Sequence, residues 1–378
     1  MKKIQMVDLK GQYDKIQNQV DETIKEVISS TSFIKGVIVR KFEKELAAYL
    51  NVKHVISCGN GTDALQVAMM GLDLKPGDEV ITVDFTFAAT VEVIGLLQLT
   101  PILVDVDPLT FNIDIKRLKE AITPKTKAIV PVHLFGQCAN MEAIMTIAKK
   151  HNLSVIEDTA QAIGADYYFK DGTSKKAGTI GTIGTTSFFP SKNLGAYGDG
   201  GALYTNDDDL AFKLRSIVNH GMSKRYHYER LGVNSRLDTL QAAVLRIKLP
   251  LLDSYAKARQ EVADFYDDAF KNCKKIKTPK RDSFTSHVFH QYTLLVDEKY
   301  RDKLHQYLLD NQIPNAIYYP IPLHQQNAYK NFIFDSDKLN VSKKLSKTVL
   351  SLPMHTEFEK EQLEYIAENI IDFFKNNI

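Results

Sequence analysis

Short β-branched segments alternate with amphipathic segments through the first two-thirds of the chain, and this alternation restricts the possible folds more than any other feature. Apolar residues recur at helical spacing in segment 141–151, for example at Ile144 and Ile147. Strands that alternate with such helices build a mainly parallel sheet with helices on both faces. The sequence therefore predicts an α/β fold, and the segments expected as buried strands are 54–57, 79–83, 101–106, 127–132 and 154–157.

The hydrophobic period changes near residue 237, where a long helical pattern begins. Apolar residues recur at helical spacing from Leu237 to Leu251, and a second pattern continues beyond Pro250. Proline has no amide hydrogen and clashes with the preceding turn, so Pro250 should separate two helices. We expect a large domain over residues 1–250 and a small C-terminal domain over residues 251–378. The later elements expected are a strand at 288–296 and helices at 300–311 and 360–375.

Composition and charge narrow the class of protein. The 378 residues are 44% hydrophobic and 25% charged, as in ordinary globular proteins. A net charge of +2 gives no broad field for nucleic acid or an anionic membrane. No window reaches the roughly 18 apolar residues of a membrane span. The odd, sparse cysteines lack metal-site spacing, so we expect a soluble cytoplasmic protein without metal, nucleic-acid or membrane partners (Cys58, Cys138, Cys273).

Lys192 lies in the most distinctive segment, residues 185–201, between an aromatic pair and a run of glycines. Desolvation disfavours the ammonium form of a lysine, and a free amine is the form that attacks a cofactor aldehyde. About thirty residues earlier an apolar strand ends at Asp158. A buried aspartate facing a pyridine nitrogen is the other requirement of pyridoxal phosphate (PLP). Together Lys192 and Asp158 indicate a PLP enzyme.

Three further residues have both a functional and an ordinary interpretation. Gln161 follows Asp158 closely enough to reach the phenolic oxygen of the same ring, but surface glutamines are common. Phe87 can stack on the ring face or pack in the core. Ser187 precedes the lysine turn and can donate to a phosphate, although most serines have no such role. Asp158 itself can instead cap a following helix.

The turn at 58–65 follows an expected strand and opens an expected helix. Its two glycines allow a tight turn, and a helix start offers free amides and a positive dipole end, which suits a phosphate. The same letters fit the dinucleotide pattern G-x-G-x-x-A, with Asp84 roughly twenty residues further on. A plain turn is the third interpretation, and the pattern alone does not choose between them.

Positive charge gathers between residues 220 and 236. The loop 220–230 is basic and aromatic, which fits either a solvated loop or a site for a nucleotide diphosphate. Arg236 precedes a strongly apolar helix and should be held in place. A fixed guanidinium binds a carboxylate through two hydrogen bonds.

Taken together, these segments resemble the DegT/DnrJ/EryC1/StrS family of PLP-dependent sugar aminotransferases. The resemblance extends over nearly the whole chain. It implies the aspartate-aminotransferase-like (type I) PLP fold, with a mainly parallel mixed sheet and a smaller α+β C-terminal domain. It also implies homodimers whose active sites use both subunits. The segments that carry it are 59–65, 86–87, 133–136, 157–162, 187–201 and 232–243.

The resemblance assigns roles around the cofactor ring. Lys192 matches the Schiff-base lysine, and Asp158 matches the partner of the pyridine nitrogen. Gln161 and Phe87 match the residues that hold the ring. Some family members replace the lysine with histidine and are dehydratases, so the retained Lys192 favours transamination.

The resemblance also assigns the phosphate site. Thr62, Ser187 and the amides near Gly61 match its phosphate binders. Asn234 matches the asparagine that reaches the phosphate of the neighbouring subunit's cofactor.

Segments 7–13 and 316–324 look like the branch that aminates C3 of nucleotide-linked 3-oxo sugars. UDP-2-acetamido-3-oxo-glucuronate aminotransferases are the most similar members. That branch often has His-Tyr-Pro where this chain has Tyr318, Tyr319 and proline. The resemblance implies that Tyr318, Tyr319 and Arg236 contact a UDP- or dTDP-linked keto sugar, with glutamate as amino donor.

Other functions remain open at this stage. A nicotinamide-dependent oxidoreductase would use the glycine turn at 58–65, but neither Lys192 nor Asp158. A C4 aminotransferase, a dehydratase or a PLP-binding sensor without turnover would keep the cofactor and change the chemistry.

Overall fold

A seven-stranded sheet forms the centre of the protein in the computed structural model, which describes residues 2–332 and 334–376. The strand order is β1-β9-β8-β5-β4-β2-β3, and β9 runs antiparallel to both of its neighbours. The remaining pairs are parallel, so the mixed, mainly parallel sheet predicted from the sequence is confirmed. The strands are β1 (His54–Cys58), β2 (Glu79–Val83), β3 (Thr100–Val104), β4 (Thr126–Val130), β5 (Ser154–Asp158), β8 (Ile183–Ser187) and β9 (Gly201–Thr205).

Both faces of the sheet are buried because successive strand residues enter different cores. Ile81 and Val155 pack in one cluster with α5 and α6, whereas Val80 and Ile156 pack in another with α3, α4 and α7. Side chains of a strand alternate between its two faces, and apolar residues on both faces require helices on each. The helices are α2 (Val37–Leu50), α3 (Gly61–Gly71), α4 (Ala89–Leu96), α5 (Ile115–Ala121), α6 (Met141–His151), α7 (Asp208–Ile217) and α8 (Thr239–Lys248).

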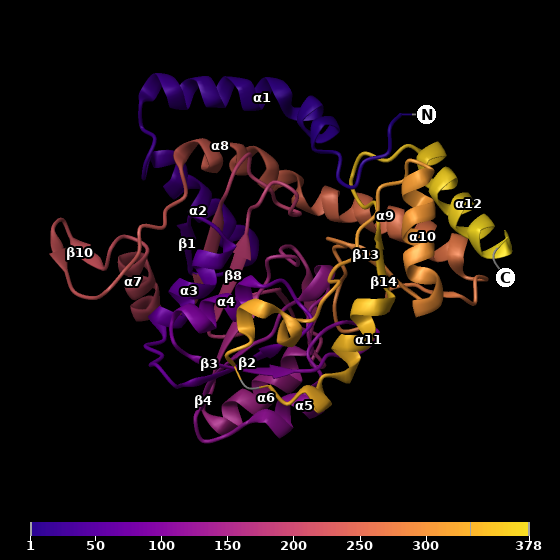
Figure 1. Ribbon diagram of the computed structural model, residues 1–378. Helices are drawn as coiled ribbons and strands as arrows, with labels where there is room; N and C mark the ends of the chain where they lie inside the picture. Colours follow the sequence, from indigo (N-terminus) through magenta and orange to yellow (C-terminus); the bar gives the residue numbers. More distant parts are fainter. Residues whose placement is uncertain (1, 333, 377–378) are drawn as a thin grey trace.

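Two elements extend from this body (Figure 1). The long helix α1 (Leu9–Ser30) lies along α8, where Ile16 and Val20 pack against Val244. The hairpin formed by β10 (Met222–Lys224) and β11 (His227–Tyr228) projects to one side. A second small hairpin is formed by β6 (Asp166–Tyr168) and β7 (Ser174–Lys176).

The helix break expected at Pro250 is present. A short 3-10 turn (Leu249–Leu251) separates α8 from α9 (Leu252–Phe270). The strand expected at 288–296 begins only at Tyr292, because the preceding residues bond to the turn at 134–136. The later elements are β12 (Ile276–Lys277), β13 (Tyr292–Val296), α10 (Glu298–Asp310), α11 (Asn340–Thr348), β14 (Val349–Leu352) and α12 (Lys360–Asn376).

The C-terminal elements have a core of their own, built around β13, β14 and α12. Residues on both sides of position 250 nevertheless pack against the other part of the protein. Ile4 packs in the C-terminal core, while Leu323 and Tyr329 pack against Val91 of the sheet-bearing part. The boundary at 250/251 stays a prediction.

None of the helices in residues 2–332 and 334–376 combines the length and hydropathy that a membrane crossing requires.

Candidate active site

The predicted site residues gather where parallel strands end. β5 ends at Asp158 and β8 ends at Ser187, and Lys192 follows a few residues later. β2 leads into the segment that contains Phe87, and β1 leads into the turn before Gly61. Strands β1, β2, β5 and β8 point the same way, so their carboxyl ends lie along one edge of the sheet. This edge is where open α/β sheets bind ligands.

The start of α3 has the geometry of a phosphate site. The side chain of Asn60 accepts a hydrogen bond from the amide of Asp63 at 2.8 Å and so caps the helix. Gly61 and Thr62 are the first residues of the helix, and amides at these positions have no acceptor within the helix. Their N–H groups and the helix dipole therefore face an incoming anion.

Two glycines let the lysine-bearing segment approach this helix start. A Cβ on Gly61 would lie 2.7 Å from Cβ of Ser187, and one on Gly201 would lie 2.4 Å from the carbonyl oxygen of Asn60. Neither position has room for a side chain. The close approach puts Ser187 beside the N-terminus of α3, as the prediction of a shared phosphate site requires.

The dinucleotide interpretation of this turn does not fit the structure. It needs the acid roughly twenty residues on, Asp84, to bind a ribose. Asp84 has no exposed surface, and its carboxylate accepts hydrogen bonds from His324 instead. The glycine turn is therefore better suited to a single phosphate.

Asp158 is buried, with 6% of its surface exposed, and its carboxylate is held from two directions. Its Oδ2 accepts a hydrogen bond from Oγ1 of Thr90 at 2.9 Å, and its Oδ1 accepts one from the amide of Ala160 at 3.1 Å. No helix begins directly after Asp158, so it is not a helix cap. Thr90 was not predicted from the sequence, and no local signal connects it to a strand so distant in the chain.

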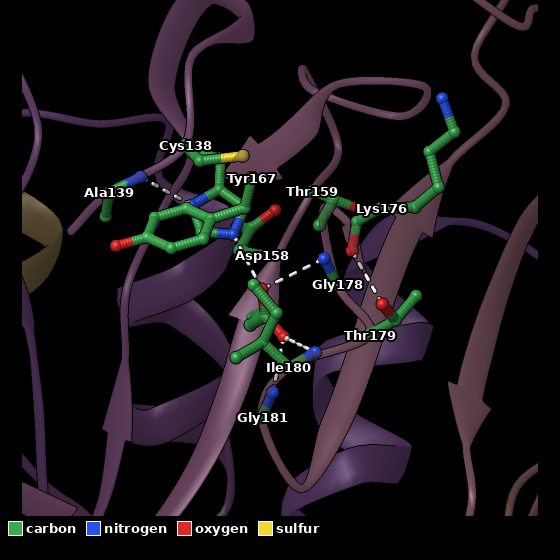
Figure 2. A network of polar contacts seen from close by, with 12 residues as sticks. Cys138, Ala139, Asp158, Thr159, Tyr167, Lys176, Gly178, Thr179, Ile180 and Gly181 are labelled. Carbon is green, nitrogen blue, oxygen red and sulfur yellow. Dashed lines mark hydrogen bonds and ion pairs between the residues drawn. The ribbon is translucent and has the colours of Figure 1, made fainter. Parts of the chain in front are cut away.

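The preceding residue, Glu157, is held in a separate buried network. Its carboxylate accepts hydrogen bonds from the amides of Gly178, Ile180 and Gly181, at 2.9, 2.7 and 2.5 Å. Figure 2 shows these three residues gathered beside the strand that carries Asp158. A fourth donor is Nε2 of His133 at 2.9 Å, because Nδ1 of that ring accepts from the amide of Ala139. The network fastens the end of β5 and so fixes the backbone at Asp158.

Replacement of Glu157 by leucine should destabilise the fold by about 3–5 kcal/mol, because four donors, two of them fully buried, lose their acceptor. The free energy of unfolding in urea measures this effect. Glu120→Leu, on the exposed surface of α5, is the control and should change stability by less than about 0.5 kcal/mol. Equal stabilities of the two variants would contradict the structural role of Glu157.

Gln161 is also fixed on both sides. Its Oε1 accepts from the amide of Phe135 at 2.8 Å, and its Nε2 donates to the hydroxyl of Tyr319 at 3.1 Å. Burial raises the pKa of Tyr319, so the phenol keeps its proton. The structure thus connects two predicted residues, one from the cofactor set and one from the substrate set.

The two aromatic candidates differ in exposure. Phe87 is 59% exposed, so its ring is accessible at the strand-end edge and is not a core residue. Tyr318 is half-buried, and its ring centroid lies 6.0 Å from that of Tyr319.

The loop that carries Lys192 is fastened at several points. The amide of Lys192 donates to the carbonyl of Phe189 at 2.8 Å, and the side-chain amide of Asn193 donates to the carbonyl of Val288 at 2.9 Å. The buried amine of Lys248 donates to the carbonyl of Gly195 at 2.7 Å. Such anchoring fixes where the Lys192 side chain begins.

Burial lowers the pKa of Lys192 to about 8, while the nearby carboxylate of Asp158 acts in the opposite direction. An ordinary lysine holds its proton to well above pH 10. Lys192 therefore offers a free amine close to neutral pH, and the free amine is the nucleophilic form.

The rate of cofactor attachment should consequently depend on pH. Below the pKa of about 8, the fraction of neutral Lys192 amine rises with pH, and above that value it levels off. Protein stripped of cofactor should regain its yellow absorption on addition of PLP at a rate that rises about tenfold per unit below pH 7 and reaches a plateau near pH 9. An attachment rate that does not change from pH 6 to 9 would contradict a Lys192 amine that loses its proton near pH 8.

The remaining predicted residues lie on segment 232–238. Ser235 is buried, accepts from the amide of Gly59 at 2.8 Å and donates to Asp63 at 2.6 Å, which fastens this segment to the start of α3. Asn234 on one side of it is exposed, and Arg236 on the other is half-buried.

A second cation, which the sequence did not single out, lies near Arg236. Burial and then the positive charge of Arg236 lower the pKa of Lys35. Lys35 belongs to the connection between α1 and α2, far from Arg236 in sequence, so only the fold brings the two together. Two neighbouring cations are suited to an anionic group.

A half-buried lysine with a lowered pKa, a held aspartate and a helix start suited to a phosphate lie at one sheet edge, which is the arrangement that a type I PLP enzyme requires. A family model described as the DegT/DnrJ/EryC1/StrS aminotransferase family matches residues 14–371. The chain therefore belongs to this family, whose aminotransferases depend on PLP.

Two relatives illustrate the range of names within it. The chain is 45% identical to a Geobacillus stearothermophilus protein named pleiotropic regulatory protein, over 99% of both chains. It is also 45% identical to the UDP-2-acetamido-2-deoxy-3-oxo-D-glucuronate aminotransferase of Pseudomonas aeruginosa, over 96% of this chain and 98% of that one.

Solved structures of the family have the same fold. An aminotransferase from Brucella abortus superposes with a TM-score of 0.93 at 41% identity, covering 98% of this chain and 99% of the other. NtdA from Bacillus subtilis, solved with its bound cofactor PMP, superposes with a TM-score of 0.90 at 31% identity, covering 99% of this chain and 86% of the other. The type I PLP fold expected from the sequence is confirmed.

Proposed function

We propose that this protein transfers the amino group of glutamate to the C3 keto group of a nucleotide-linked sugar. The observation that carries the proposal is the meeting of Lys192, Asp158 and the start of α3 at one sheet edge, in a chain of the sugar aminotransferase family. The name of the 45% identical Pseudomonas relative supports a UDP-linked 3-oxo sugar acid. The product would serve amino-sugar biosynthesis for surface polysaccharides such as O-antigen.

The site residues fit PLP. Thr62, Ser187 and the Gly61 amide would hold its phosphate, since they lie together at the α3 N-terminus. Phe87 would stack on the ring face, and Gln161 would lie beside the phenolic oxygen. When bound, PLP provides an electron sink for the substrate carbon attached through nitrogen.

Two side chains would carry the chemistry. Asp158 would stay ionised opposite the pyridine nitrogen and stabilise its positive charge, while Thr90 keeps the carboxylate aimed. Nζ of Lys192, once released by the amino donor, would remove the proton from the α-carbon of glutamate as a general base. The same amine would then deliver that proton to the C4′ carbon of the cofactor as a general acid, which its pKa of about 8 permits near neutral pH.

Substrate recognition would involve two cations, Arg236 and Lys35, and two tyrosines, Tyr318 and Tyr319. Arg236 and Lys35 together suit a carboxylate or diphosphate on the nucleotide sugar. Tyr318 and Tyr319 would contact the sugar from the other side of the site.

The working form is proposed to be a homodimer with shared active sites. Phe33, Ile34 and Val37 expose 42–56% of their surfaces at the connection between α1 and α2, and an exposed apolar cluster of this kind favours a protein partner. Leu231, at the base of the projecting hairpin, is 90% exposed. In such a dimer Asn234 would reach the cofactor phosphate of the partner subunit.

We place the protein in the cytoplasm. The cysteines at positions 58, 138 and 273 are free thiols, which suits a reducing compartment.

A non-catalytic regulatory role is the second candidate, because the Geobacillus relative at 45% identity is named a pleiotropic regulatory protein. The full set of PLP-site residues argues for turnover. A regulator needs the cofactor pocket, but it does not need a lysine poised to move protons.

The deciding experiment supplies PLP, ¹⁵N-glutamate and a panel of UDP- and dTDP-linked 3-oxo and 4-oxo sugars, and identifies products by mass spectrometry and NMR. The proposal expects ¹⁵N at C3 of a UDP-linked sugar. Label at C4 would assign the C4 branch instead. A PLP-loaded protein that labels no sugar would support the regulatory role.

A further inference from the structure

A buried hydrogen-bonded pair, Asp84 and His324, joins two segments that lie far apart in the sequence. Asp84 follows β2 and is fully buried, and the side chain of His324 is only 4% exposed. Nδ1 of His324 donates to Oδ2 of Asp84 at 2.7 Å, and the backbone amide of His324 donates to Oδ1 at 2.8 Å. The amide of Leu323 donates to the carbonyl of Asp84 at 3.2 Å. Three hydrogen bonds to one aspartate fasten the turn at 323–325 to the end of β2.

The segment that receives these bonds is part of the active site. Directly after Asp84 the chain carries Phe87, and then Thr90, which holds Asp158. The hydroxyl of Tyr329 adds a weaker contact to the carbonyl of Ala88 at 3.3 Å. The hydrogen bonds between Asp84 and His324 therefore connect the C-terminal part of the chain to the proposed cofactor-stacking segment.

The other end of the same loop is held at a second point. Tyr319 receives the hydrogen bond from Gln161, and its ring packs edge-on against Phe85 with centroids 5.8 Å apart. Residues 318–324, which we call the tyrosine loop, are thus fixed at Tyr319 and at His324. Tyr318, the proposed sugar contact, begins this loop.

We propose that His324 is a positioning residue for the sugar half of the reaction, because its imidazole holds the tyrosine loop where Tyr318 and Tyr319 meet the keto sugar. This inference rests on the proposed function. It assigns His324 no contact with substrate or cofactor.

The hydrogen bond from His324 to Asp84 matters because the carboxylate of Asp84 is buried. Without the Nδ1 proton, a carboxylate oxygen stays buried with no donor, which is costly unless water reaches it. The β2 side cannot move easily, since the amide of Asp84 remains bonded to Val104 of the neighbouring strand segment. The tyrosine loop is the part that must shift. The loop that carries Lys192 is fastened through Asn193 and Gly195 and not through His324. The glutamate half of the reaction should therefore continue.

Two variants of similar size separate the hydrogen bond from the packing. His324→Leu removes the donor, whereas His324→Asn keeps an amide N–H near the position of Nδ1. With UDP-2-acetamido-2-deoxy-3-oxo-D-glucuronate as probe, we expect the leucine variant to raise KM by about tenfold or more, as the loss of a hydrogen bond to a charged group predicts. The asparagine variant should stay within about threefold of the wild type. In both variants, glutamate should remove the yellow absorption of the lysine-bound cofactor at the wild-type rate.

Hydrogen–deuterium exchange in the absence of sugar gives an independent measurement. Peptides that cover residues 316–324 should exchange faster in the leucine variant only, because local opening controls exchange. Should that variant fail to fold, Asp84→Ala removes both acceptor oxygens that hold His324 and should show the same pattern.

The inference is overturned if the leucine variant matches the wild type in KM and exchange, if the asparagine variant behaves like the leucine variant, or if both half-reactions fall equally. A wild-type protein that aminates no keto sugar overturns the proposed function and this inference with it. A wild-type protein that does so, with an unaffected leucine variant, overturns this inference alone.

Discussion

Replacement of Lys192 by alanine is expected to lower the rate of transamination by at least about 10²–10⁴-fold, which is the range a positioned acid–base group contributes. The structure gives the reason. Lys192 has a buried amine with a pKa lowered to about 8, beside Asp158 and at the ends of the parallel strands. Alanine removes both the covalent attachment point and the group that moves the proton.

Lys248 provides a matched control for this variant. Its amine is also buried, with a pKa lowered to about 8, and it also contacts the lysine loop through the carbonyl of Gly195. The electrostatic influence of Asp158 acts on Lys192, whereas that on Lys248 comes from Arg259. Borohydride reduction and peptide mass mapping should therefore place the cofactor on Lys192 and leave Lys248 unmodified. Attachment at Lys248, or wild-type turnover by Lys192→Ala, would contradict the assignment.

Replacement of Asp158 by asparagine should leave the fold intact and slow deprotonation of glutamate by about 10²–10³-fold, as expected when one preorganised electrostatic contact is lost. The asparagine is nearly the same size, and its oxygen can still accept from Thr90 or Ala160. What is lost is the negative charge that stabilises a protonated pyridine nitrogen. Exchange of the α-hydrogen of glutamate with solvent deuterium measures the affected step directly.

Thr90→Val is the companion variant, because it removes only the hydrogen bond that aims the carboxylate. We expect a decrease of about three- to tenfold, the effect of one ordinary hydrogen bond. An Asp158→Asn protein that exchanges the α-hydrogen as fast as the wild type would remove Asp158 from the proposed role.

The fold was predictable where the information is local. Each β-branched run produced a strand because both of its faces are apolar, and Pro250 ended a helix for steric reasons that do not depend on context. The strand expected from residue 288 was too long, because the amides of Val288 and Gln291 bond to the turn at 134–136 and not to a strand. Nothing local distinguishes these two outcomes for an apolar segment.

Part of the candidate site could also be predicted from local sequence, although the roles of its residues stay predictions. The unusual surroundings of Lys192 and the acid at the strand end are visible in short stretches of sequence. The hydrogen bond from Thr90 that aims Asp158 depends on chain folding, because the two residues lie far apart in the sequence. Strand geometry could have separated Glu157 from Asp158, since successive side chains point to opposite faces.

The most direct measurement is the visible spectrum of the PLP-loaded protein through one complete cycle. Glutamate should remove the yellow band of the lysine-bound cofactor, and UDP-2-acetamido-2-deoxy-3-oxo-D-glucuronate should then restore it. Restoration by this or a related 3-oxo sugar would show both half-reactions at a single site. A band that does not respond to glutamate, or one that no keto sugar restores, would contradict the account.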